Sequence, residues 1–158
     1  MHDDIDKWID YQRLRAAEQE PGSRRALIVE DDTGLQTIIQ RIVKSIHPDM
    51  EIVWATNLGE AHLALKECKF SYKQCPDLIL TDIYLPGLQM GTALWDYCMA
   101  HFPGTPFVFM SSSPADSYLK LFENPMEVPP FISKPFTVSQ CKKTIEAAME
   151  GTTGRIAT

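Results

Sequence analysis

Residues 76–87 read PDLILTDIYLPG, a short apolar run that ends at a carboxylate and is followed by a proline–glycine turn. The apolar residues are consecutive rather than alternating with polar ones, and Asp82 follows directly after them. A run of this kind is typical of a strand that is covered on both faces in a parallel sheet. We therefore predict a buried strand over residues 77–81, with Asp82 at its carboxyl end.

Four more strand-like runs lie on either side of this stretch, over residues 26–29, 51–55, 106–110 and 129–133. Segments with apolar residues three and four positions apart separate the runs and predict amphipathic helices. The apolar residues of the five predicted helices run from Leu35 to Ile46, Leu58 to Cys68, Leu94 to Cys98, Ala115 to Phe122 and Val138 to Met149. Thr33 is expected to be the N-cap of the first helix. Strands that alternate with helices predict an α/β fold, a doubly wound sandwich with right-handed crossovers and helices on both faces of the sheet.

Composition and charge narrow the class of protein. The 158 residues are 44% hydrophobic with a net charge of -6, which fits one folded domain and argues against nucleic acid or an anionic membrane as the partner. The sequence has no apolar stretch of membrane-spanning length and no secretory signal, so we expect a cytoplasmic protein whose four cysteines are free thiols. We expect an N-terminal helical extension and linker over residues 1–22, the main domain over 23–150 and a short tail over 151–158.

Polar side chains of complementary chemistry follow four of the predicted strands. In an open parallel sheet, ligands bind outside the carboxyl ends of the strands, near the point where the strand order reverses. The strand ends place three carboxylates, a hydroxyl and an ammonium there, from Glu30, Asp31, Asp82, Ser111 and Lys134. Neighbouring carboxylates repel unless a cation intervenes, and Mg²⁺ binds carboxylates together with waters and phosphate oxygens.

This set therefore predicts a site for Mg²⁺ and a phosphoryl group. Asp82 is the expected nucleophile, since carboxylates can form covalent acyl phosphates, and Lys134 is expected to neutralise the phosphoryl oxygens. A serine hydroxyl is expected to donate a hydrogen bond to one of them, from Ser111 or in its place from Ser112 or Ser113.

The same strand ends carry four motifs that resemble the receiver domains of two-component response regulators. The motifs are LIVEDD at residues 27–32, PDLILTDIYLPG at 76–87, PFVFMS at 106–111 and FISKPF at 131–136. Four motifs in this order make the resemblance specific, and it covers about residues 25–150. It implies a flavodoxin-like, five-stranded parallel sheet of strand order 2-1-3-4-5, to which this chain adds an N-terminal helix. It also implies that a histidine kinase or a phosphotransfer protein phosphorylates Asp82.

The resemblance further assigns a metal-binding role to individual residues. Asp31 is expected to bind Mg²⁺ directly, and Glu30 directly or through a water. Asp82 and the backbone carbonyl of Tyr84 complete the expected ligands. Tyr84 is bulkier than many residues at this position of the family, and we hypothesise that it hinders the attacking water and slows loss of the phosphoryl group.

A second group of residues is assigned to the phosphoryl group and to a switch. Ser111 and Lys134 are expected to contact the phosphoryl group, and the bond between Lys134 and Pro135 is expected to be cis. Phe131 matches the aromatic switch position, where the ring moves inward when Ser111 is drawn to the phosphate; the alternative is that Phe131 only fills the core. Phe131 lacks the hydroxyl of the commoner tyrosine, so it cannot signal through a phenolic hydrogen bond.

The expected output is a protein contact. The fourth helix, fifth strand and fifth helix, over about residues 114–148, would bind an unknown downstream protein, and a homodimer is left open. We expect no enzyme activity beyond the chain's own phosphorylation and dephosphorylation. One alternative is a receiver fold that binds partners without being phosphorylated. The other is a metal-dependent phosphohydrolase with an aspartyl intermediate, which commonly has a second acid two residues after the nucleophile, where this chain has Tyr84.

Overall fold

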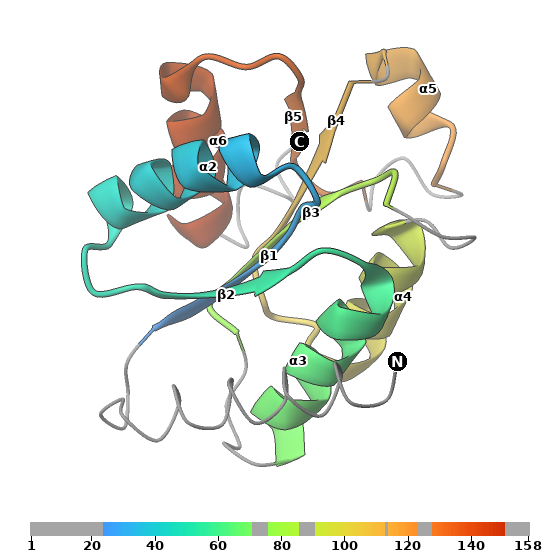
Figure 1. Cartoon of the computed structure of the whole chain (residues 1–158). Helices are drawn as coiled ribbons and strands as arrows, with labels where there is room; N and C mark the ends of the chain where they lie inside the picture. The colour runs from blue at the N-terminus through green and yellow to red at the C-terminus, as the bar shows by residue number, and fades with distance from the viewer. Residues whose placement is uncertain (1–23, 71–75, 86–90, 113, 123–127, 151–158) are drawn as a thin grey trace.

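Five parallel strands form the central sheet of the computed structural model, which describes residues 24–70, 76–85, 91–112, 114–122 and 128–150. The strands are β1 (Arg25–Val29), β2 (Glu51–Ala55), β3 (Leu78–Asp82), β4 (Phe107–Ser111) and β5 (Phe131–Ser133). Their order across the sheet is β2-β1-β3-β4-β5, and every pairing is parallel (Figure 1). The predicted fold class and strand order are therefore confirmed, while the predicted N-terminal helix lies outside the described residues.

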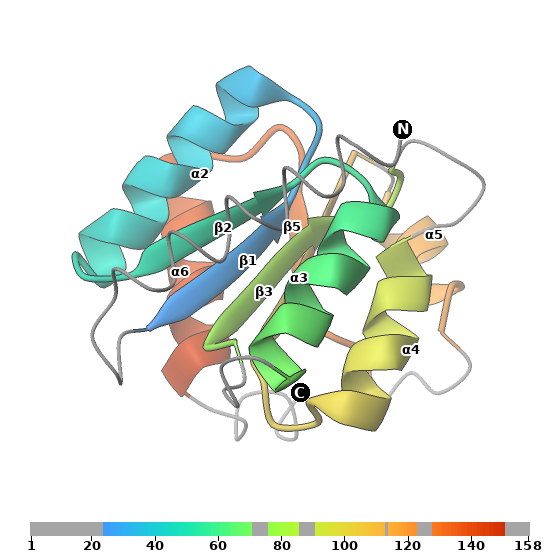
Figure 2. The same cartoon turned by 60° about the horizontal axis from the view of Figure 1, so that its bottom comes forward.

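Helices cover both faces of the sheet. One face carries α2 (Thr33–Ile46) and α6 (Val138–Glu150), and the other carries α3 (Leu58–Phe70), α4 (Gly91–His101) and α5 (Ala115–Leu119) (Figure 2). From β2 the chain returns past β1 to form β3, so the strand order reverses between β1 and β3. None of the described helices combines the length and the apolar composition that crossing a bilayer requires.

Alternate residues of the central strands face opposite helical layers. Leu27 and Val29 of β1 belong to the core beneath α3 and α4, whereas Ala26 and Ile28 belong to the core beneath α2 and α6. Every residue of β1, β3 and β4 is buried. Burial on both faces explains why these strands are apolar without alternation in the sequence. The cysteines that the structure describes, Cys68, Cys98 and Cys141, are buried, and Cys98 and Cys141 are free thiols.

The start of α2 corrects one prediction. Asp32, not Thr33, is the N-cap, because its side chain accepts hydrogen bonds from the backbone N–H of Gly34 at 2.9 Å and of Leu35 at 3.1 Å. A carboxylate here satisfies two N–H groups that have no partner within the helix, and its charge complements the helix dipole.

Two other elements are shorter than predicted. The last strand covers residues 131–133 instead of 129–133, since Pro129 and Pro130 have no N–H to donate to a neighbouring strand. The helix α5 ends at Leu119 instead of Phe122. Asp82 and Ser111 are the last residues of their strands, in agreement with their predicted place at the strand ends.

Candidate functional site

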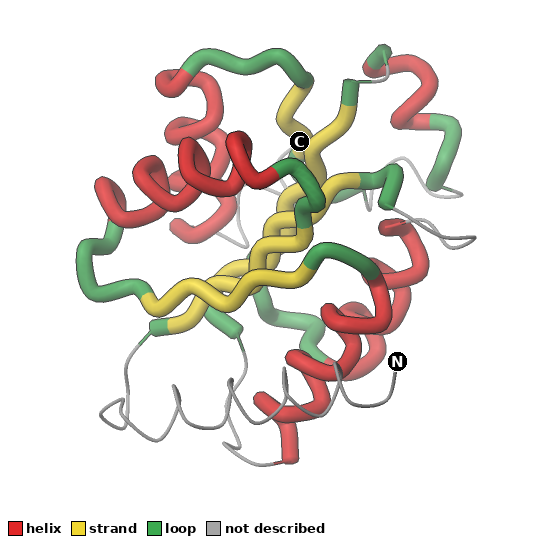
Figure 3. The backbone as a smooth tube through the Cα atoms, in the orientation of Figure 1, coloured by secondary structure: helices red, strands yellow, loops and turns green. Residues whose placement is uncertain are grey.

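The carboxyl ends of β1, β3, β4 and β5 meet at one edge of the sheet, where the loops that follow them begin (Figure 3). At this edge β1 and β3 are neighbours, and Val29 is paired with Thr81. The next residues of the two segments, Glu30 and Asp82, therefore lie close together. This reversal of strand order is the place where doubly wound sheets bind ligands.

Backbone contacts fix Glu30 at the end of β1. The backbone N–H of Glu30 donates to the carbonyl of Ala55 at 2.9 Å. The backbone carbonyl of Glu30 accepts a hydrogen bond from the side-chain amide of Gln36 at 2.7 Å. Glu30 is 1% exposed, whereas Asp31 and Asp32, which follow it, are exposed. Of the three consecutive acidic residues, only Glu30 is buried at the site.

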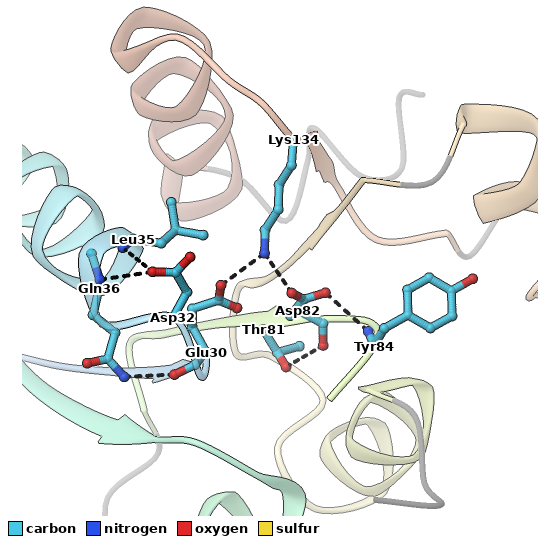
Figure 4. A network of polar contacts seen from close by, with 9 residues as sticks. Glu30, Asp32, Leu35, Gln36, Thr81, Asp82, Tyr84 and Lys134 are labelled. Carbon is cyan, nitrogen blue, oxygen red and sulfur yellow. Dashed lines mark hydrogen bonds and ion pairs between the residues drawn. The ribbon is translucent and has the colours of Figure 1, made fainter. Parts of the chain in front are cut away.

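Lys134 reaches the two carboxylates from the end of β5. Its backbone N–H donates to the carbonyl of Ser111 at 2.8 Å, which continues the pairing of β4 with β5. The peptide bond between Lys134 and Pro135 is cis. The ammonium nitrogen lies 2.6 Å from Asp82 Oδ2 and 3.0 Å from Glu30 Oε1 (Figure 4). The structure thus gathers three of the expected site residues around one ammonium group.

Asp82 is held from two sides. Lys134 donates to Oδ2, and the backbone N–H of Tyr84 donates to Oδ1 at 3.1 Å. The side chain of Tyr84 is exposed, and its ring points away from the carboxylate (Figure 4). In this orientation the ring does not shield Asp82 from water, so the arrangement lends no support to the hypothesis that Tyr84 slows hydrolysis.

The backbone around Asp82 is packed tightly against α4. Gly91, the first residue of this helix, donates its N–H to the carbonyl of Ile83 at 2.7 Å. A Cβ atom at Gly91 would lie 2.5 Å from the carbonyl oxygen of Asp82 and 3.2 Å from the ring of Phe109. Only glycine lets the helix begin this close to the site. Gly91 was not among the residues predicted for the site, although a glycine at the start of the helix after the Asp82 loop was an available signal.

Burial and ion pairing shift the pKa values of Glu30 and Lys134. Burial raises the pKa of Glu30 from the ordinary 4.5 to about 7, although the hydrogen bond and the charge of Lys134 act in the opposite direction. Burial alone would lower the pKa of Lys134, but the hydrogen bonds and charges of Asp82 and Glu30 more than offset this and raise it. Near neutral pH the site therefore holds a charged ammonium beside a Glu30 carboxyl that is close to its own titration midpoint.

The oxygen atoms of the site fit a hard divalent cation. Glu30 Oε2 is buried and has no hydrogen-bond partner among the residues that the structure describes. Buried polar atoms are normally satisfied, and a bound cation is one way to satisfy this one. Mg²⁺ commonly uses only one or two carboxylates beside waters and phosphate oxygens. Glu30 and Asp82 supply such a pair.

Asp31 is the third carboxylate that was expected at the site. Across the described part of the chain, no three His, Cys, Asp or Glu side chains are grouped so as to hold a metal ion. The expected convergence of three carboxylates is therefore not seen at Asp31, which is exposed. The role of Asp31 as a direct metal ligand stays a prediction.

The expected switch residues lie on β4 and β5. Ser111 is fully buried at the end of β4, whereas Ser112 is exposed and Ser113 lies outside the described residues. Phe131 is half-buried, and its ring stacks on Tyr118 of α5 with the centroids 4.3 Å apart and the planes 16° apart. Tyr118 was not singled out from the sequence, because nothing in its spacing indicates this contact.

The fold and the site together define a class of protein. A doubly wound, flavodoxin-like sheet carries two carboxylates, bridged by an ammonium, at the point where its strand order reverses. The model of the response regulator receiver domain matches residues 26–146, and the chain belongs to this family. Receiver domains are generally signalling switches rather than enzymes that act on a separate substrate, and they typically bind Mg²⁺. Membership also implies interaction with a histidine kinase or a phosphotransfer protein.

Solved structures agree with this assignment. The non-phosphorylated HemR receiver domain from Leptospira biflexa is 26% identical, with a TM-score of 0.62 over 81% of this chain and 95% of that one. The phosphorylated cyanobacterial phytochrome response regulator RcpA is 22% identical, with a TM-score of 0.64 over 82% and 93%. A response regulator receiver protein from Sinorhizobium medicae is 17% identical, with a TM-score of 0.68 over 84% and 98%. No curated protein matches the sequence significantly.

Proposed function

We propose that the chain is a phospho-accepting switch in which Asp82 takes a phosphoryl group from a histidine kinase or a phosphotransfer protein. The observation that carries the proposal is the ammonium of Lys134, which lies 2.6 Å from Asp82 Oδ2 at the reversal of strand order. A cation fixed beside a carboxylate nucleophile orients that carboxylate. It also stabilises the negative charge of an arriving phosphoryl group.

The transfer requires one bond to form and one to break. A carboxylate oxygen of Asp82 attacks the phosphorus of a phosphohistidine, so that an O–P bond forms while the N–P bond breaks. The electron pair of the broken bond returns to the imidazole nitrogen of the donor. Lys134 donates hydrogen bonds to the phosphoryl oxygens during this step. Glu30 and Asp82 would hold Mg²⁺, and the resemblance assigns Asp31 and the carbonyl of Tyr84 as further ligands. The charge of the ion, when bound, would offset that of the phosphoryl oxygens.

The signal leaves the site through β4 and β5. Ser111 donates its hydroxyl to the phosphoryl group, and Phe131 on the neighbouring strand moves inward behind it. These shifts alter the surface made by α5, β5 and α6, over residues 114–148, where a downstream protein or a second copy of the chain binds. A phosphoryl group adds nearly two negative charges and strong acceptor oxygens, which is enough to bias such a two-state surface.

Phosphorylation by a small-molecule donor tests the proposal. The chain is incubated with acetyl phosphate and Mg²⁺ and followed by intact mass, and one phosphoryl adduct is expected. Asp82→Asn is expected to abolish the adduct. Asp96→Asn, which makes the same exchange at an exposed position of α4, is expected to keep it. An adduct that persists in Asp82→Asn contradicts the assigned acceptor. No adduct on the wild type favours a receiver fold that binds its partners without phosphorylation.

A further inference from the structure

Tyr118 is a buried aromatic residue that joins α5 to β5. It is 2% exposed although it lies on a helix of only five residues. Its ring stacks on Phe131 at 4.3 Å and meets Phe122 edge-on at 5.1 Å and Phe109 at 6.0 Å. Phe131 therefore has one face covered by a residue of the neighbouring helix.

The hydroxyl of Tyr118 is anchored to the chain segment that leads into β5. It donates a hydrogen bond to the backbone carbonyl of Pro129 at 2.6 Å. Burial raises the pKa of Tyr118 well above its usual value, so the hydroxyl keeps its proton and remains a donor. The carbonyl of Pro130 in turn accepts from the N–H of Phe109 at 3.0 Å, which ties the same segment to β4.

These contacts oppose the movement of Phe131 that the proposed function requires. The ring can move behind Ser111 only if it leaves the face of Tyr118 or takes Tyr118 with it. The hydrogen bond to Pro129 and the packing against Phe109 and Phe122 prevent Tyr118 from following freely. A contact made only in the resting arrangement lowers the apparent affinity for any ligand that favours the other arrangement.

We propose that Tyr118 is a positioning residue that holds Phe131 in its resting place and so sets the threshold for the switch. This inference rests on the proposed function of Asp82 and deepens it. The hydrogen bond to Pro129 is the part that can be removed without removing the ring. The same bond ties α5 to the segment that leads into β5, so its loss removes one of the contacts that hold these two parts together.

Tyr118→Phe tests the inference, because it deletes the hydroxyl and keeps the ring. The probe is beryllium fluoride with Mg²⁺, a mimic of the phosphoryl group, titrated against the folded chain. The variant is expected to bind the probe roughly two- to tenfold more tightly than the wild type, the range that one net hydrogen bond covers. Tyr97→Phe is the matched control: it makes the same exchange on α4, where the Tyr97 ring contacts His62 and His101, and it is expected to leave the affinity unchanged.

The outcomes separate this inference from the function on which it rests. Equal or weaker binding by Tyr118→Phe, with urea unfolding showing a folded but less stable chain, overturns the inference and leaves a structural role for the hydroxyl. Tighter binding by both tyrosine variants also overturns it, since the effect would then not be specific to Tyr118. No binding by the wild type overturns the proposed function itself, and the inference with it.

Discussion

Glu30 makes the resting site sensitive to pH. Burial places its pKa at about 7 in the folded chain, whereas the ordinary value for an unfolded glutamate is 4.5. Between these values the folded state binds more protons than the unfolded state, so the free energy of unfolding falls as the pH rises. The contribution of Glu30 to the free energy of unfolding is fully present below pH 4.5 and is lost as the pH rises through about 7. Its size is at most about 3 kcal/mol, from the tabulated free energy per pKa unit.

Urea unfolding in the presence of a chelator measures this decline. Glu30→Gln removes the titrating group and is expected to flatten the pH profile between these two values, because glutamine carries no proton to lose. Glu146→Gln on α6 makes the same exchange away from the site and is expected to keep the wild-type profile. A profile that is unchanged by Glu30→Gln would mean that other groups produce the decline.

Lys134 is the one cation that pairs with both carboxylates of the described site. Lys134→Met leaves Glu30 and Asp82 as neighbouring carboxylates with no ammonium between them. Removing one partner of a buried ion pair costs about 3–5 kcal/mol. The Lys134 side chain is 19% exposed and Glu30 can take up a proton, so we expect a smaller loss. Above pH 7 and without Mg²⁺, the free energy of unfolding is expected to fall by about 1–3 kcal/mol. Lys143→Met, on the exposed face of α6, is the control, and an equal effect of both variants would contradict the prediction.

At the scale of elements, the start of α4 is the most constrained junction near the site. Gly91→Ala would place a Cβ 2.5 Å from the carbonyl oxygen of Asp82 and 3.1 Å from the Cα of Ile83, and these backbone atoms have little room to give way. Overpacking of this kind costs about 1–3 kcal/mol, and we expect a loss of stability in that range by urea unfolding. Phosphorylation of Asp82 is expected to slow as well. Gly104→Ala is the control, since no atom lies within 4 Å of a Cβ there. A fully stable Gly91→Ala chain would show that α4 can shift without cost.

The ends of elements show where a sequence pattern stops being informative. The strand cores were predictable because burial on both faces demands consecutive apolar residues. The N-cap of α2 was not predictable, since Asp32 and Thr33 are both good capping residues and only the backbone geometry decides between them. The last strand was predicted too long because Pro129 and Pro130 are apolar but cannot donate a hydrogen bond to a neighbour.

At the scale of the whole molecule, topology assembles the site from distant residues. Lys134 is 104 residues from Glu30 and 52 from Asp82. Their meeting could be predicted, because parallel strands end at one edge of a sheet. The sequence could not predict which carboxylate after β1 is buried at the site. It also could not predict that the ring of Tyr118 stacks on that of Phe131. Both depend on side-chain packing between elements, which no spacing in the sequence reports.

The same topology predicts that Mg²⁺ stabilises the entire fold. The unfolded chain does not hold Glu30 and Asp82 together, so the ion binds the folded state alone. Such a ligand adds about 2.7 kcal/mol to the free energy of unfolding at a hundred times its dissociation constant. The midpoint of urea unfolding is expected to rise with Mg²⁺ concentration and to return when EDTA is added. Asp82→Asn is expected to weaken this rise and Asp96→Asn to keep it. A wild-type midpoint that does not respond to Mg²⁺ would contradict binding at this site, because any ion bound only by the folded chain must shift the unfolding equilibrium.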